Sequence, residues 1–403
     1  MKLGSMENKK IIIVGGGLSG LGCAKRLSEN GVEFKLITED IGGRLKTSAD
    51  GETNYGAYYI TADCHNIMLY VEKVNIVHFA KAHFHRGKGC KKCAECKEHY
   101  HAYSLRMLKH IPAGIRLLIE LFKFRRHHQK VRRQALNAGY QELIEADPYL
   151  RKYYHQKAEV FIKENGLEAL TKEYLEQFLW AAYFTDAREV STAIFLGVLM
   201  TIIVPSYSFK FHFEKLIAPF KERIISDSVK KVVRSVGQKF RLETKSGKIY
   251  ECDILVLATP MNITNNLVKP QKIKGGINVN YYHLQGKIKK EYDVAWYNFF
   301  PIEEETAISR EPNGTYLYFS GRKDNFARYF DSWEIIYEGE WKPALFFFGD
   351  EYINENPEPN LFLANDHNVP STEDAFINGQ HIANLILKKD KKVGNVIEVR
   401  DKK

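Results

Sequence analysis

Three glycines near the start of the chain, Gly15, Gly17 and Gly20, have the G-x-G-x-x-G spacing that can cradle a diphosphate. Gly15 would allow a tight turn, Gly17 would let the backbone approach the phosphates, and Gly20 would let a helix pack closely on a strand. Phosphate oxygens could then bind free N–H groups at the start of that helix, beside Ser19. These residues predict a dinucleotide-binding turn.

The residues on either side of this turn predict the strand–helix–strand unit that such a site requires. Residues 11–14 form an apolar run, apolar residues recur at helical spacing over 18–27, and residues 32–37 form a second strand-like run. An acid after the second strand would accept hydrogen bonds from the adenosine ribose, and we select Glu39 for this role. The alternative interpretation is an exposed loop carboxylate.

A Gly42-Gly43-Arg44 run follows this acid. With this run the chain resembles the superfamily of FAD-dependent amine oxidases, protoporphyrinogen oxidases and phytoene desaturases. The resemblance implies that Gly43 and Arg44 lie along the pyrophosphate and the flavin. The loop between Glu39 and Gly42 is shorter than is usual in the family.

The residues around 225–258 support the resemblance from the middle of the chain. They are typical of a β-meander with a hairpin at Ser246-Gly247 and a buried strand at 254–257, and they end in Ala258-Thr259-Pro260. The family has a similar meander and a similar ending. The resemblance implies that the backbone of Val229 contacts the adenine.

A third segment, residues 360–379, is similar to the C-terminal flavin motif of the family. The resemblance implies that Asp366 holds the ribityl chain and that backbone N–H groups near Ala375 and Phe376 face the pyrimidine ring of the flavin. Asn365 and Asp374 stand where the family has glycines. A degenerate site without flavin is the alternative. No cysteine follows Cys252, which excludes a C-terminal thioether, so we expect FAD to bind noncovalently.

Three cysteines, Cys90, Cys93 and Cys96, form a C-x-x-C-x-x-C array between two pairs of histidines. Such a group of thiolates and imidazoles fits a tetrahedral zinc site completed by a histidine or by Cys64. Reduced surface thiols without metal and an iron–sulfur cluster are the alternatives.

Residues 105–133 carry nine lysines and arginines against one acid, Glu120, and leucines give the segment an apolar side. It could lie on an anionic membrane surface. A solvated helix face is the simpler interpretation, and binding of nucleic acid or of an anionic substrate is less favoured because charge alone does not specify a partner.

The chain has 403 residues, 44% of them hydrophobic, and a formal net charge of +10. No apolar run reaches the length of a membrane span, and the N-terminus has no signal-peptide pattern, so we expect a cytoplasmic protein. We predict an α/β fold with a discontinuous, Rossmann-like FAD-binding domain from residues 1–80, 205–270 and 342–395. A substrate domain, helical and mixed-sheet, would comprise residues 81–204 and 271–341, with a Cys/His-rich insertion at 81–101.

The resemblance implies an oxidoreductase that transfers a hydride from a C–N or C–C bond of a small-molecule substrate to flavin N5. Oxygen or a quinone would reoxidise the flavin, because a second G-x-G-x-x-G for NAD(P)H is missing. The family often has a lysine near N5, and Lys287 is a candidate. A non-redox isomerase or mutase, or a binding protein that has lost catalysis, are the alternatives.

Overall fold

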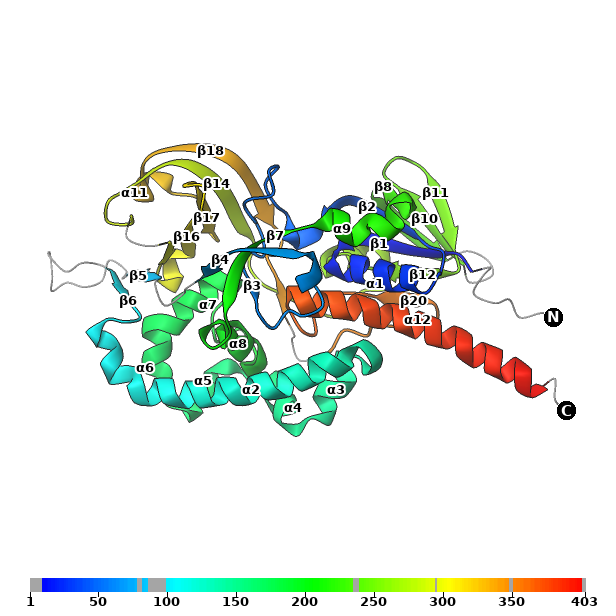
Figure 1. Cartoon of the computed structure of the whole chain (residues 1–403), viewed down its shortest axis with the longest axis horizontal. Helices are drawn as coiled ribbons and strands as arrows, with labels where there is room; N and C mark the ends of the chain where they lie inside the picture. Colours follow the sequence, from blue (N-terminus) through cyan, green and yellow to red (C-terminus); the bar gives the residue numbers. More distant parts are fainter. Residues whose placement is uncertain are drawn as a thin grey trace.

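The computed structural model describes residues 9–77, 82–85, 99–234, 239–293, 296–347 and 351–400, with side chains up to residue 388. Figure 1 shows strands across the upper part of the molecule and a layer of helices below them. Within the described residues, no helix combines the length and the apolarity needed to cross a bilayer.

A five-stranded parallel sheet forms the core of one half of the molecule. Its order is β20-β12-β1-β2-β8, with β1 in the centre. The strands are β1 (Ile11–Gly17), β2 (Lys35–Gly42), β8 (Ile224–Ser226), β12 (Ile254–Leu257) and β20 (Leu361–Leu363). The strand order reverses on either side of β1, and ligands of open parallel sheets bind at such a switch point, beyond the carboxyl ends of the strands.

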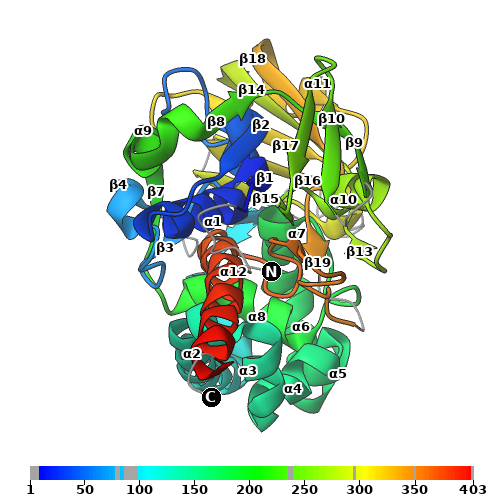
Figure 2. The ribbon, with the colours of Figure 1, turned by 90° about the vertical axis from the view of Figure 1, so that its right-hand side faces the viewer.

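The two faces of β1 contact different elements because its side chains alternate between them. Ile11 and Ile13 pack against α1 (Leu18–Glu29) and α12 (Thr372–Arg400), the helices nearest the sheet in Figure 2. Ile12 and Val14 pack against the antiparallel meander of β9 (Val229–Arg234), β10 (Phe240–Thr244) and β11 (Ile249–Cys252). Both faces of the sheet are therefore covered.

A second, seven-stranded sheet lies in the other half, in the order β18-β14-β17-β16-β15-β5-β6. Its strands are β5 (His83–His85), β6 (His99–His101), β14 (Val279–Ile288), β15 (Tyr297–Phe299), β16 (Thr306–Arg310), β17 (Tyr316–Ser320) and β18 (Phe330–Trp341). One face of this sheet packs on the helical layer through Phe84, Phe299 and Phe319.

The helical layer comprises η5 (Leu105–His110), α2 (Ile111–Ala138), α3 (Tyr140–Ala146), α4 (Pro148–His155), α5 (Ala158–Glu164), α6 (Glu168–Leu170), η6 (Thr171–Leu175), α7 (Glu176–Tyr183), α8 (Thr192–Leu199) and η7 (Met200–Ile202). The remaining elements are η2 (Gly43–Leu45), β3 (Ile60–Thr61), η3 (Met68–Tyr70), β4 (Val71–Val77), β7 (Ser206–Phe211), α9 (Phe213–Ile217), η8 (Ala218–Arg223), α10 (Met261–Leu267), β13 (Lys274–Gly275), η9 (Ile302–Glu304), α11 (Phe326–Tyr329) and β19 (Phe346–Phe347).

This architecture confirms the predicted α/β fold with a Rossmann-like sheet. All five parallel strands come from residues 1–80, 205–270 and 342–395, while the domain boundaries themselves stay a prediction. The predicted meander was too long, because β8 and β12 at its two ends pair in the parallel sheet and only β9, β10 and β11 are antiparallel. The hairpin turn at Ser246-Gly247 is where it was predicted, and Gly247 has φ +83°.

Candidate active site

A cavity of about 840 Å³ lies beyond the carboxyl ends of β1, β2, β12 and β20. The parallel sheet provides one side of its wall and the helical layer provides the other. The segments that line it lie within residues 14–19, 37–47, 56–64, 124–132, 182–204, 227–229, 258–263, 341–346 and 364–375, together with Tyr154 and Phe213. The three segments of the predicted cofactor site, far apart in sequence, therefore meet at one cavity.

The three glycines of the first turn have three different surroundings. Gly15 has φ +110°, and a Cβ there would lie 2.5 Å from the carbonyl oxygen of Ala258. A Cβ on Gly20 would lie 2.0 Å from the carbonyl oxygen of Gly15, so only glycine lets α1 pack this closely on β1. A Cβ on Gly17 would meet no atom within 4 Å. The backbone at Gly17 therefore borders open space in the cavity, as a site for an approaching diphosphate requires.

Thr38, in the middle of β2, holds this turn in place. Its hydroxyl accepts a hydrogen bond from the backbone N–H of Gly16 at 2.9 Å and donates one to the carbonyl of Asp40 at 2.7 Å. The next residue, Glu39, is exposed and lies 2.6 Å from the Lys245 amine. Glu39 and Val229 both line the cavity, at the end where we predicted the adenosine.

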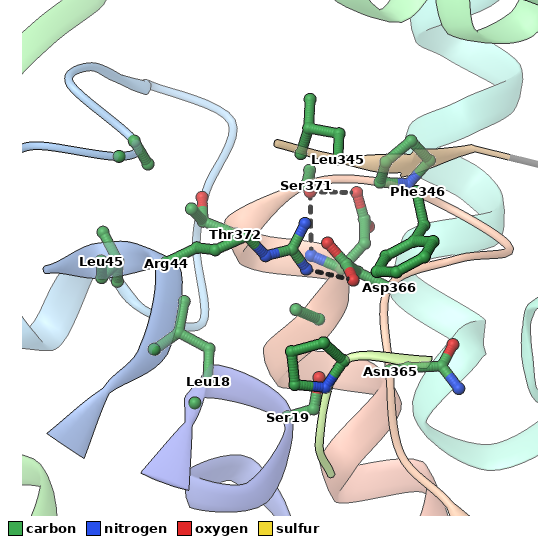
Figure 3. A pocket seen from close by; sticks show the side chains of 18 of the residues that line it. Leu18, Ser19, Arg44, Leu45, Leu345, Phe346, Asn365, Asp366, Ser371 and Thr372 are labelled. Carbon is green, nitrogen blue, oxygen red and sulfur yellow. Dashed lines mark hydrogen bonds and ion pairs between the residues drawn. The ribbon is translucent and has the colours of Figure 1, made fainter. Parts of the chain in front are cut away.

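Arg44 and Asp366 point toward one another across the cavity in Figure 3. The guanidinium of Arg44 donates to the carboxylate of Asp366 at 2.5 Å, which joins η2 to the loop after β20. Gly43, beside Arg44, has φ +58° and also lines the cavity, as do Ser19 and Ala375. The two residues predicted to contact the cofactor from opposite ends of the chain are thus direct neighbours.

Asp374, which stands where the family has a glycine, forms a buried ion pair with Arg132 of α2. The two guanidinium nitrogens donate to its carboxylate at 2.8 and 2.5 Å, and the hydroxyls of Tyr140 and Ser371 donate to it as well. Burial alone would raise the pKa of Asp374, but Arg132 and its hydrogen bonds hold that pKa well below its usual range. The carboxylate therefore remains ionised, and its charge is neutralised within the protein.

The arginines of this cavity wall were not identified from the sequence. Arg125 binds Asp63 with two hydrogen bonds, at 2.7 and 2.8 Å, seven residues before Arg132 binds Asp374. A separation of seven residues places both on one side of a helix. This seven-residue spacing could have indicated that the two arginines share a helix face. It was missed because most other cations in residues 105–133 are exposed.

Two residues in the wall of this cavity have buried polar atoms without partners. The side-chain nitrogen of Asn365 and both ring nitrogens of His367 are buried without a hydrogen-bond partner. Both residues line the cavity, and burial lowers the pKa of His367 to about 4, so its imidazole is neutral at pH 7. Buried polar groups in proteins are nearly always hydrogen-bonded. These atoms are closed off from the cavity itself, so the fit to FAD depends on the open backbone at Gly17 and on Arg44 and Asp366 in the cavity wall.

Two of the predicted cofactor residues do not line the cavity. Gly20 acts through packing, as described, and the Phe376 side chain lies in the core beside Tyr70. Lys287 was a wrong candidate for the catalytic lysine, because it is exposed on β14 and pairs with Asp331 at 3.5 Å.

The cysteine array Cys90, Cys93 and Cys96 lies outside the described residues, so zinc binding stays a prediction. The flanking histidines lie in β5 and β6. These two strands pair with each other, so that His83 lies opposite His101 and His85 lies opposite His99. Burial lowers the pKa of His83 and of His85 to about 4. In the part of the chain that the structure describes, no group of three or more His, Cys, Asp or Glu residues is arranged to hold a metal. Cys64, considered as a further ligand, is buried in the wall of the main cavity.

On the side of the helical layer the cavity wall is mainly apolar and aromatic. It includes Tyr58, Tyr59, Tyr154, Tyr183, Phe184, Ile194, Met200 and Val204. Burial raises the pKa of Tyr58 and of Tyr183 well above the ordinary value, so both phenols keep their protons. The carboxylates on this side, Asp63 and Asp374, are both paired with arginines.

Solved structures of amine oxidases share this arrangement of elements. A putrescine oxidase bound to putrescine matches with a TM-score of 0.63 at 13% identity, over 94% of this chain and 99% of that chain. This chain has the amine oxidase fold. Cyclohexylamine oxidase from Brevibacterium oxydans IH-35A matches with a TM-score of 0.62 at 12% identity, over 94% of this chain and 99% of that chain.

An oxidoreductase from Methanosarcina mazei matches with a TM-score of 0.58 at 13% identity, over 93% of this chain and all of that chain (100%). Residues 13–73 match the family model of an NAD(P)-binding Rossmann-like domain. No curated protein matches the chain in sequence. The fold that the sequence resemblance implied is therefore confirmed, with a Rossmann-like segment at its start.

Proposed function

We propose that this protein is an FAD-dependent oxidoreductase of the amine oxidase-like superfamily that binds FAD noncovalently in the cavity described above. The observation that carries the proposal is the convergence of three cofactor segments, distant in sequence, on one cavity. Bound FAD would accept a hydride at N5 from a C–N or C–C bond of the substrate, with oxygen or a quinone as the final acceptor.

The residues of this chain would divide the binding of FAD between the two ends of the cavity. Gly17 and the start of α1 would receive the diphosphate, and Glu39 and Val229 would hold the adenosine. Arg44 and Asp366 would lie along the diphosphate and the ribityl chain. Asn365 and the neutral His367, on either side of Asp366, would hold the loop that contacts the flavin, since Asn365 accepts a hydrogen bond from the backbone N–H of His367.

The apolar wall on the helical side favours a substrate with an apolar body. The two carboxylates there are paired with arginines, so neither is available for the second ammonium of a diamine. We therefore propose an apolar monoamine, or a neutral molecule oxidised at a C–C bond, rather than a polyamine. The phenols around Tyr58 would exclude water and keep the reacting bond in place.

The first experiment is the visible spectrum of the purified protein, followed by identification of any flavin that denaturation releases. We expect a yellow protein that releases FAD, and bleaching of the flavin when an apolar amine is added without oxygen. Peroxide formation on admission of air would distinguish net oxidation from an isomerase or mutase. A colourless protein that FAD cannot reconstitute would contradict the proposal and would favour a binding protein.

Elemental analysis of the same sample tests the predicted zinc. Zinc bound in constant ratio to protein, and lost when Cys90 and Cys93 are replaced by serine, is the expected result. The cytoplasmic location, which also stays a proposal, is tested by fractionating cells of the source organism.

A further inference from the structure

Helix α2 has an exposed apolar face that no packing within the described residues explains. Its buried side chains, among them Leu117, Leu121 and Phe124, already fill the contact with the rest of the helical layer. Large apolar side chains also point to solvent, with Ile115 53% exposed and Phe122 57% exposed. The exposed set is Leu105, Leu108, Ile111, Ile115, Leu118, Ile119 and Phe122.

Leu105 and Leu108 belong to η5, which leads into α2. The other five lie on one side of α2, because positions 111, 115, 118, 119 and 122 follow the spacing of a single helical face. The same face continues beyond Phe122 as Arg126, Gln129, Lys130 and Arg133. The first half of the face is therefore apolar, and the second half is basic. Contiguous apolar surface of this kind on a soluble protein marks a site of interaction.

The basic half of the face has its charges unpaired. Arg126, Lys130 and Arg133 form no ion pair with any acid in the described part of the chain. Glu120, the acid of this helix, points elsewhere and binds Lys123 and the Tyr153 hydroxyl. A hollow of about 600 Å³ lies beside these cations, lined by Phe122, Arg125, Arg126, Gln129, Lys130, Arg133 and Gln134.

This hollow adjoins the main cavity, because Arg125 and Gln129 line both. In Figure 1, α2 runs along the lower edge of the molecule, away from the parallel sheet. A surface that binds along α2 would therefore lie close to one wall of the main cavity, without covering the end that holds Gly15 and Glu39.

We propose that this face of α2 docks on an anionic lipid bilayer, with the apolar half inserted at the level of the headgroups and the basic half on the lipid phosphates. An amphipathic helix that lies in the interface combines these two kinds of contact. The charge selects this partner: an anionic surface complements the unpaired cations, whereas a second copy of the chain would add cations of its own. The docking does not depend on the reaction that the cavity carries out.

The test is sedimentation of the purified full-length protein with vesicles of phosphatidylcholine, with and without phosphatidylglycerol. We expect binding to the anionic vesicles that weakens as salt is added. Replacing Arg126, Lys130 and Arg133 together by glutamine should weaken it roughly 100-fold, at roughly fivefold for each cation. The matched control replaces Lys231, Arg241 and Lys248 on the meander by glutamine, which changes the net charge equally and should leave binding unchanged.

The apolar half is tested separately with the double variant Ile115→Ser/Phe122→Ser, which should weaken binding roughly tenfold or more. Both positions are exposed, so its thermal unfolding midpoint should match that of the wild type. In a Phe122→Trp variant, the fluorescence of the new tryptophan should in addition be quenched by lipids brominated in the acyl chain. Equal binding to both kinds of vesicle, no binding, or equal losses in the α2 variant and the meander control would overturn the proposal.

Discussion

The buried pair of Arg132 and Asp374 gives the sharpest test of how this cavity is built. The Arg132 and Asp374 side chains are 10% and 1% exposed, so replacing Arg132 by methionine would leave a buried carboxylate without its cation. Removing one partner of a buried ion pair costs about 3–5 kcal/mol. The entropy of unfolding is about 2.1 cal/mol/K per residue, which over 403 residues converts this cost into a fall in Tm of about 4–6 °C.

The pH dependence of this loss has a definite sign. In the wild type the pKa of Asp374 is lowered, so the pair stabilises the fold above the unfolded pKa and this is lost only as pH falls through the folded pKa. In Arg132→Met, burial without the cation raises that pKa. The deficit in Tm should therefore be largest at pH 8 and should shrink as the pH is lowered to about 5.

The assay is thermal unfolding of the protein stripped of cofactor, followed by circular dichroism at each pH. Arg188→Met is the matched control, because Arg188 pairs with Asp186 but its side chain is 68% exposed, and exposed pairs contribute little. Adding Asp374→Asn to Arg132→Met should recover most of the lost stability. If the double variant is as unstable as Arg132→Met, or if the deficit does not change with pH, the unpaired carboxylate is not the cause.

Three further predictions concern the cavity. Gly17→Val should leave Tm nearly unchanged but lower flavin retention at least tenfold, because this position borders open space. Gly20→Ala should lower Tm, because its Cβ would meet backbone atoms. Equal effects of the two variants in both assays would contradict these roles. His367→Leu should leave the thermal stability of the apoprotein unchanged or higher, because both ring nitrogens are buried without partners. Because burial lowers the pKa of His367 to about 4, the wild type should lose stability as pH falls from about 6.5 to 4, and His367→Leu should lose less in the same melts. An apolar monoamine should have a higher kcat/KM than a diamine of equal length in a peroxide assay, since Asp63 and Asp374 are already paired; a preference for the diamine would show that one of these pairs opens.

The parts of the fold that the sequence predicted depend on local patterns. The glycine turn, α1 and the strands around them were predicted because periodicity and turn residues act within a few positions. The ends of the meander were assigned wrongly for the same reason: the short apolar runs of β8 and β12 look alike whether their partners are parallel or antiparallel. Pairing with β2 and β1, far away in sequence, decides between the two.

The convergence of Arg44 and Asp366 followed from the family resemblance, since nothing local connects residues 322 positions apart. The partner of Asp374 was missed because Arg132 lies 242 positions away on a helix where most cations face solvent. A carboxylate at position 374, where the family has a glycine, indicates that a nearby cation or hydrogen-bond donors must compensate its charge. Only the packing of α2 against α12 shows which residue provides it.

The position of β20 at the edge of the parallel sheet has a consequence for how the protein is made. The ribosome completes β1 early, but β20 (Leu361–Leu363) is made much later, and Asp366 is added 322 residues after Arg44. Until then the central strands lack β20, α1 lacks α12, and Arg44 lacks its partner. The binding surface therefore cannot mature before this late segment has been made, and any cofactor must be loaded after it. Because so many contacts join distant segments, this final closure should also be the slow step of folding.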